Sequence, residues 1–448
     1  MLSPAALYPI LLSWLQAMKV IDHRTAQPVL AHLLTALLTA QSLRPSALMR
    51  ALSSPLPVPA RQRYKRVARA WTRPWLSPAW LTPRLVRAVL ALVWPDPVGP
   101  TAGRTHLALD SVRCGKWEIF TLGVVWHGRA LPVGWAVLPY PWPKRQFTPT
   151  VCALLQQVAA AWPADRPAHL IADRAFPSRR LFQTLRALGW GWTVRLRANN
   201  WVTVAGQSQA VRTLLAQAKA GRWTVVAGAF GGTTHPIAGT VVIGRGLPVL
   251  PRHQRTPGSL RHRARQHAQR ERHLRDKRPR RYRQTAATAT DRWVVLFTTH
   301  STWSAATTTY RLRWATEGTY RDAQSGWDGK HGWDLEPVVA RLTEALQVER
   351  VVGLWALGTL VQSWVGHQTA LVTAPVHVHA LVGQWTTTGR LSVWARGRLA
   401  LTDPSGLLRD WLRETLQAGA QQVAAAQALP ALQRQRRTKP GVPTRKAA

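Results

Sequence analysis

Three acidic residues have the chemistry and the surroundings expected of ligands for divalent metal ions. Asp110 follows the compact apolar run His106–Leu109, and Asp173 follows the similar run His169–Ala172. Each aspartate is expected to close a β-strand, where a buried carboxylate is costly unless a cation or hydrogen bonds compensate it. Glu317 is expected on a helix. Carboxylate oxygens suit Mg²⁺, and two such ions can activate water or a 3′-hydroxyl for attack on a phosphodiester.

Each acidic residue also has a simpler structural interpretation when it is taken alone. Asp110 and Asp173 would be turn or capping residues, because Asp is common at both kinds of position. Glu317 would form a surface pair with Arg313, worth roughly 0.2–0.5 kcal/mol. Two aspartates at equivalent strand ends favour the metal-site interpretation. The other acidic residues considered have ordinary structural explanations. Asp96 lies between prolines, Asp291 would start a strand, and Asp322 lies on the opposite side of the helix. Loop or cap positions are expected for Asp328, Asp334 and Glu336.

A single predicted helix over Trp303–Gln324 would gather polar side chains around the glutamate. At about 100° per residue, one arc of this helix carries the acid together with two phenols, two guanidinium groups and an amide. The members of this arc are Tyr310, Arg313, Glu317, Tyr320, Arg321 and Gln324. The run Thr307–Thr309 and Gly318 lower the helix propensity of the segment.

The elements that would position these residues alternate between short strands and helices. The predicted order is strand 106–110, strand 117–126, strand 131–138, helix 148–161, strand 169–173, helix 178–188 and strand 191–196, with strand 293–298 returning to the core. Short connections between the first three strands imply an antiparallel meander. The helix that follows favours a crossover and a mixed sheet. This order predicts an α/β chain with an RNase H-like core.

The charge balance indicates a polyanionic partner. The chain has 60 Lys and Arg against 19 Asp and Glu, a formal net charge of +41. Nucleic acid is the commonest partner of so basic a protein, and arginine suits phosphate oxygens. A GC-rich genome would inflate the arginine count but would not explain the scarcity of acids. A membrane-surface or ribosome-associated protein is the alternative.

Other features of the sequence bear on where the chain works. Cys114 and Cys152 have no metal-ligand spacing and imply no disulfide framework, which fits a reducing cytosol. The apolar segment Leu2–Ala17 is interrupted by prolines and reads poorly as a signal peptide. No segment is expected to span a membrane. The expected location is the cytoplasm.

Five regions are expected along the chain. They are 1–100, a helical and DNA-end-binding domain; 101–197, the first part of the catalytic core; 198–290, a β-rich insertion with a basic arm at 252–283; 291–370, the second part of the core and following helices; and 371–448, a C-terminal helical region with a basic tail. The break Ser42–Ser46 fits a helix-turn-helix or an ordinary helical hairpin. The basic residues of 61–69 would lie on DNA or form a solvated helix face.

Three motifs resemble those of the DDE transposases of bacterial insertion sequences, in the subgroup whose core is split by a β-strand insertion. Leu107–Asp110 is similar to the first acidic strand of that family. Asp173-Arg174-x-Phe176 is similar to the pattern around its second acid. Tyr310-x-x-Arg313-x-x-x-Glu317 is similar to its YREK signature, although Gln324 stands where the signature ends in Lys.

This resemblance implies an activity, a cofactor and partners. Asp110, Asp173 and Glu317 would hold two Mg²⁺ ions, for which Mn²⁺ is expected to substitute. The reaction would be cleavage at terminal inverted repeats followed by strand transfer into target DNA, and the protein would act as a homodimer on double-stranded DNA. The residues implied in DNA binding are Tyr310, Arg313, Arg321, Gln324 and Arg174.

Two other functions remain open on the sequence. A catalytically impaired, transposase-derived DNA-binding protein or repressor is favoured by Gln324 and opposed by the intact acids. A basic RNA-associated structural protein would leave the strand-end acids unexplained. Trp201, Trp223 and Trp293 are candidates to stack on a flipped base, but a core role is the alternative for each.

Overall fold

A computed structural model describes most of the first 368 residues. The described ranges are 4–21, 24–52, 59–93, 104–218, 222–231, 236–245, 293–324, 333–368 and 411–418, with single positions at 397, 401 and 421. The predicted basic arm, the prolines around residue 97 and the basic tail lie outside these ranges. The chain divides into two compact units: unit 1 is Met1–Ile171, Thr184–Trp190 and Leu312–Ala448, and unit 2 is Ala172–Gln183 and Gly191–Arg311.

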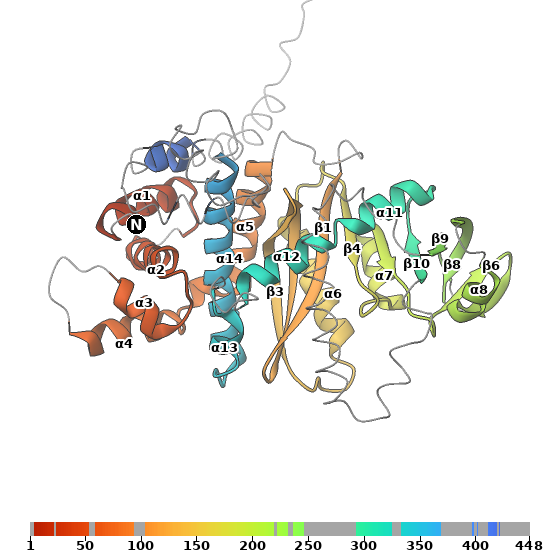
Figure 1. Ribbon diagram of the computed structural model, residues 1–448, viewed down its shortest axis with the longest axis horizontal. Coiled ribbons are helices and arrows are strands. Elements are labelled where there is room, and N and C mark those ends of the chain that lie inside the picture. Colours follow the sequence, from red (N-terminus) through yellow and green to blue (C-terminus); the bar gives the residue numbers. More distant parts are fainter. Residues whose placement is uncertain are drawn as a thin grey trace, which may run out of the picture. The chain divides into compact units, whose positions relative to one another are not determined.

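The N-terminal part of unit 1 is helical, as predicted (Figure 1). Its elements are α1 (Pro4–Ala17), α2 (Ala26–Ala40), α3 (Pro45–Ala51), α4 (Ala60–Ala70), the 3₁₀ turn η1 (Pro74–Leu76) and α5 (Pro78–Val93). Gln41 ends α2 in the left-handed region with a φ of 50°. The Leu43 N–H then donates to the Trp333 carbonyl at 2.8 Å. The predicted break between two helices is confirmed, whereas its use on DNA stays a prediction.

The sheet of unit 1 has the mixed order predicted for an RNase H-like core. Its strands are β1 (Thr105–Cys114), β2 (Trp117–Trp126), β3 (Arg129–Pro139) and β4 (Ala168–Ala172). They lie in the order β3-β2-β1-β4, with β1–β2 and β2–β3 antiparallel. The Thr105 N–H donates to the Pro167 carbonyl at 3.1 Å, so β1 and β4 begin side by side and run parallel. Helix α6 (Phe147–Ala161) supplies the crossover between β3 and β4.

Helices cover both faces of this sheet. A Cβ on Gly134 of β3 would lie 2.6 Å from the Val158 side chain, so α6 approaches that face closely. The next residue, Trp135, points the other way and donates from Nε1 to the Glu349 carbonyl of α14 (Ala345–Gln368) at 2.8 Å. Helix α12 (Trp314–Ala323) also contacts β1, β2 and β3, where Ala315 packs in a small apolar cluster.

Two expectations about the bounds of elements need correction. Asp110 was expected to close its strand, but β1 continues to Cys114, because Ser111–Cys114 pair with Trp117–Phe120 in the hairpin. The helix expected over Trp303–Gln324 is also wrong: it consists of α11 (Trp303–Arg311) and α12, separated by a turn. At the turn, residues 315 and 316 donate to carbonyls three residues back, and Leu312 joins the apolar cluster under α12.

Unit 2 contains the predicted β-rich insertion. Its strands are β5 (Gly191–Arg195), β6 (Trp201–Val204), β7 (Gln207–Ala210), β8 (Thr224–Phe230), β9 (Ile237–Arg245) and β10 (Trp293–Thr298), in the spatial order β5-β10-β9-β8-β6-β7. The insertion β6–β9 falls between β5 and β10 and includes a helix that was not predicted, α8 (Val211–Gln217). Phe182, Phe230 and Phe297 pack ring to ring in the core of this unit.

The remaining helices complete the described chain. Helix α7 (Arg179–Ala187) is divided between the two units, and α13 (Leu335–Val339) precedes α14. Residues 411–418 are helical. Among the described residues, no helix is both long enough and apolar enough to cross a bilayer.

Candidate active site

Helix α12 is fixed to the sheet of unit 1 by polar contacts along its length. β3 is the edge strand next to it, and its Ala130 N–H donates to Thr319 Oγ1 at 2.9 Å, while the same hydroxyl lies 3.1 Å from the Ala130 carbonyl. At the end of the helix, Asp322 forms an ion pair with Arg129. The Arg129 guanidinium can lie across α12 because Gly318 has no side chain there. These contacts hold α12 against β3.

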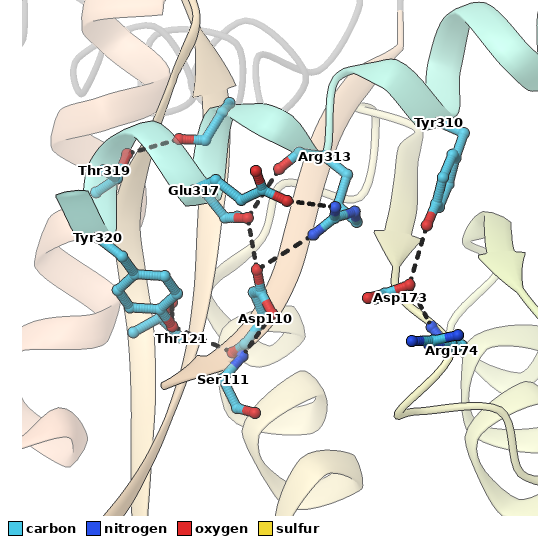
Figure 2. Close-up of polar contacts among 12 residues, drawn as sticks. Asp110, Ser111, Thr121, Asp173, Arg174, Tyr310, Arg313, Glu317, Thr319 and Tyr320 are labelled. Carbon is cyan, nitrogen blue, oxygen red and sulfur yellow. Dashed lines mark hydrogen bonds and ion pairs between the residues drawn. The ribbon is translucent and has the colours of Figure 1, made fainter. Parts of the chain in front are cut away.

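Asp110 lies on the face of β1 that α12 covers. Its Oδ1 accepts a hydrogen bond from the Ser111 N–H at 2.9 Å. Its Oδ2 accepts one from the Thr316 hydroxyl at 2.8 Å and lies 3.6 Å from Nη1 of Arg313 (Figure 2). The carboxylate is 17% exposed. Hydrogen bonds and a nearby cation therefore compensate the cost of keeping a charge in this half-buried place.

Arg313 joins Asp110 to Glu317. Its Nη2 donates to Glu317 Oε1 at 2.5 Å, so the pair expected from their i,i+4 spacing is present. The Glu317 side chain is 49% exposed, whereas that of Arg313 is 12% exposed. An isolated surface pair would explain only the contact with Glu317. Because the same guanidinium also faces Asp110, two carboxylates far apart in sequence converge on one cation.

Tyr320 anchors the backbone behind Asp110. Its hydroxyl lies 2.6 Å from Oγ1 of Thr121 and donates to the Asp110 carbonyl at 3.3 Å. Its ring stacks on Trp355 of α14. Burial, and secondly the negative charge of Asp110, raise the pKa of Tyr320 well above its ordinary value. The phenol is therefore neutral at physiological pH and remains available as a donor.

Asp173 and Tyr310 meet in unit 2. Asp173 directly follows β4, as predicted, and its Oδ1 accepts hydrogen bonds from the Arg174 N–H at 2.7 Å and the Tyr310 hydroxyl at 3.0 Å (Figure 2). Arg197 supports the same turn by donating to the Arg174 carbonyl at 2.6 Å. A pocket of about 240 Å³ beside this turn is lined by Arg174, Arg195, Leu196, Arg197, Ala198, Val211, Leu215 and Val295.

The predicted site residues thus fall into two described clusters. Asp110, Arg313 and Glu317 come together in unit 1, and Asp173, Arg174 and Tyr310 come together in unit 2. Within the described parts of the chain, no group of three or more His, Cys, Asp or Glu side chains has the geometry of a metal site.

Other residues of the predicted face have different surroundings. Arg321 is exposed on α12, whereas Gln324 follows the last helical residue in an extended conformation. Tyr320 is buried rather than presented beside Glu317. Asp334, expected as a cap, stands directly before α13 and accepts hydrogen bonds from Ser42 and Arg44.

Sequence reasoning missed Thr316 and Thr121. A signal for Thr316 is its position inside a helix directly before Glu317, because a β-branched residue there lowers helix propensity and needs a reason to be present. Thr121 could be found only from the strand register, which places it opposite Asp110.

The donor chemistry of unit 1 fits a divalent metal ion. Carboxylate oxygens are the ligands that Mg²⁺ takes in proteins. The observation that supports the fit is the shared cation: Asp110 and Glu317 already direct oxygens at the single guanidinium of Arg313. In unit 2, Asp173 has the same type of donor, and Tyr310 holds one of its oxygens.

Comparison with known families assigns part of the chain. Residues 143–331 match the family described as "Transposase DDE domain". The matched region includes Asp173, Tyr310, Arg313 and Glu317, whereas Asp110 precedes it. No curated protein matches the chain. The RNase H-like order of strands agrees with this match, and over residues 143–331 the chain is similar to the DDE domain of transposases.

Proposed function

We propose that the chain cleaves DNA at transposon ends and joins the freed ends to target DNA, with Asp110, Asp173 and Glu317 as ligands of two Mg²⁺ ions. Mn²⁺ would substitute for Mg²⁺. The observation that carries the proposal is the convergence of Asp110 and Glu317 on Arg313. The family match and the apolar strand before Asp173 support the third ligand.

Each residue would have a defined part in this reaction. When bound, the metal ions would activate water or a 3′-hydroxyl and stabilise the leaving oxygen. Asp110 would direct Oδ2 into the site, because Oδ1 is held by its neighbouring N–H. Tyr310 would orient Asp173 through its hydroxyl. Arg313 would exchange a carboxylate contact for a DNA phosphate, which a guanidinium binds well.

The proposed partners are the terminal inverted repeats and target DNA. Five residues are proposed to contact DNA: Tyr310, Arg313, Arg321, Gln324 and Arg174. The N-terminal helical region would bind the ends, and two copies of the chain would act together as a homodimer on double-stranded DNA. The excess of 60 basic over 19 acidic residues supports phosphate contact and association with the nucleoid.

Replacement of Asp110 by Asn tests the proposed chemistry. Asn keeps the shape and the hydrogen-bonding capacity but removes the negative charge that a metal needs. We expect strand cleavage of end-containing DNA with Mg²⁺ to fall by roughly 10³-fold or more, while DNA affinity measured by gel shift stays close to that of the wild type. Asp165→Asn, at an exposed turn, is the matched control and should cleave normally.

The same assay separates a second candidate function. Gln324, in place of the signature Lys, favours a transposase-derived protein that binds DNA without cutting it. Such a protein would shift end-containing DNA but give no cleavage with Mg²⁺ or Mn²⁺. An Asp110→Asn protein that nicks at the wild-type rate would instead show that the site is misassigned.

A further inference from the structure

We propose that Thr316 is a positioning residue for the Asp110 carboxylate, and that its hydroxyl sets how tightly the chain binds a divalent metal ion. The inference rests on the proposed function, because it concerns the same site. Thr316 on α12 places Oγ1 2.8 Å from Oδ2 of Asp110 on β1. The residue is 2% exposed, so the contact is shielded from bulk water.

The single hydroxyl proton of Thr316 has two acceptors within reach. The Arg313 carbonyl, one turn earlier in the chain, also lies 2.8 Å from Oγ1. That local bond is the usual one for a threonine in a helix. A hydrogen bond to an ionised carboxylate is roughly twice as strong as one between neutral groups. The proton therefore goes to Asp110 in preference to the carbonyl.

The contact fixes the oxygen that matters for cation binding. The terminal torsion of an Asp side chain is broad and has no strong preference of its own. The Ser111 N–H holds Oδ1, and Thr316 holds Oδ2, so the plane of the carboxylate is set from both sides. Oδ2 is also the oxygen that faces the Arg313 guanidinium. Loss of the Thr316 hydroxyl would remove the hydrogen bond that holds this oxygen and leave it only the longer contact with Arg313.

A purely structural role for Thr316 makes different predictions. In that case the hydroxyl is satisfied by the Arg313 carbonyl, and the methyl group fills space under α12. Removal of the hydroxyl would then change the stability of the fold and leave metal affinity unaltered.

Three substitutions in the full-length chain distinguish these roles. Thr316→Val removes the hydroxyl at nearly constant volume, and Thr316→Ser keeps the hydroxyl but removes the methyl group. Thr319→Val is the matched control, because it removes a buried hydroxyl one turn later whose partner is the backbone of Ala130. Mn²⁺ binding is titrated by the electron paramagnetic resonance signal of the free ion. Thermal unfolding without metal reports the stability of each variant.

We expect metal affinity and thermal stability to respond to different substitutions. Thr316→Val should weaken Mn²⁺ affinity by about 10- to 100-fold, the usual effect of losing a group that orients a metal ligand. Thr316→Ser should restore wild-type affinity, and Thr319→Val should retain it even if either protein melts earlier. In the cleavage assay, Thr316→Val should raise the Mn²⁺ concentration for half-maximal rate more than it lowers the rate at saturating metal.

Two results would overturn the inference. Wild-type Mn²⁺ affinity in Thr316→Val is one, and equal weakening by Thr316→Val and Thr319→Val is the other. The same Mn²⁺ titration of Asp110→Asn shows which of the two proposals has failed. If Asp110→Asn also binds Mn²⁺ normally, the proposed metal site is wrong; if it binds weakly, only the positioning role of Thr316 is wrong.

Discussion

At the scale of single residues, the charged carboxylate of Asp110 is stabilised by hydrogen bonds that neighbouring residues donate. Its two carboxylate oxygens and its carbonyl accept hydrogen bonds from Ser111, Thr316 and Tyr320. Tyr320 can play this part only while its phenol is protonated. The Tyr320 ring is buried and packs on Trp355, and this burial keeps the phenol protonated by raising its pKa.

The raised pKa of Tyr320 predicts a loss of stability in alkali. The unfolded chain releases this proton near pH ~10, whereas the folded chain holds it to higher pH. The contribution of Tyr320 to the free energy of unfolding is thus fully present below pH ~10 and is lost as pH rises towards the folded-state pKa. The melting temperature should fall between pH 9 and pH 11, and less steeply in Tyr320→Phe.

The exposed Tyr64 supplies the control for this measurement. Tyr64→Phe removes a phenol without removing a buried one and should leave the alkaline decline as it is in the wild type. Equal pH profiles for the wild type and Tyr320→Phe would contradict the assignment.

The three candidate acidic residues could be singled out at this scale, but the groups that donate hydrogen bonds to them could not. Acids are scarce in the chain, and Asp110 and Asp173 both follow apolar runs of residues, so they stand out in the sequence. Thr316 and Thr121 are ordinary residues whose role depends on α12 meeting β1 and β2. No local pattern encodes a contact between segments so far apart.

At the scale of elements, short apolar runs made several strands of both units predictable. The limits of β2 and β10 agree with the sequence prediction to the residue, because turn residues or charges flank apolar runs. The division of the predicted helix into α11 and α12 was missed. Helical periodicity continues across Leu312 and Arg313, and the break depends on Leu312 packing against the sheet.

Helix α14 approaches η1 closely at Gly353. A Cβ there would lie 2.3 Å from the backbone oxygen of Leu76 in η1. Gly353→Ala would improve helix propensity by roughly 1 kcal/mol in an open setting. Here the clash with backbone dominates, and we expect a net loss of about 1–3 kcal/mol in the free energy of unfolding.

Denaturant unfolding of Gly353→Ala measures this balance. A lowered midpoint is expected, together with slower cleavage if α14 shifts the sheet on which Asp110 lies. A raised midpoint would mean that propensity outweighs packing and that α14 is not held closely at η1.

At the scale of the whole molecule, the three proposed ligands are distributed over both compact units. Asp110 and Glu317 belong to unit 1, and Asp173 belongs to unit 2 with Tyr310. The strong positive charge suits a polyanionic partner, since DNA phosphates neutralise arginines such as Arg313. Metal binding by all three carboxylates is therefore expected to be tightest when DNA is bound.

The most direct test is a crystal structure of the full chain bound to end-containing DNA in the presence of Mn²⁺, with the metal located by anomalous scattering. We expect two ions about 3.5–4 Å apart, with oxygens of Asp110, Asp173 and Glu317 in their coordination spheres and Arg313 turned to a phosphate. Ions bound elsewhere, or carboxylates that remain too far apart on DNA to share them, would contradict the account.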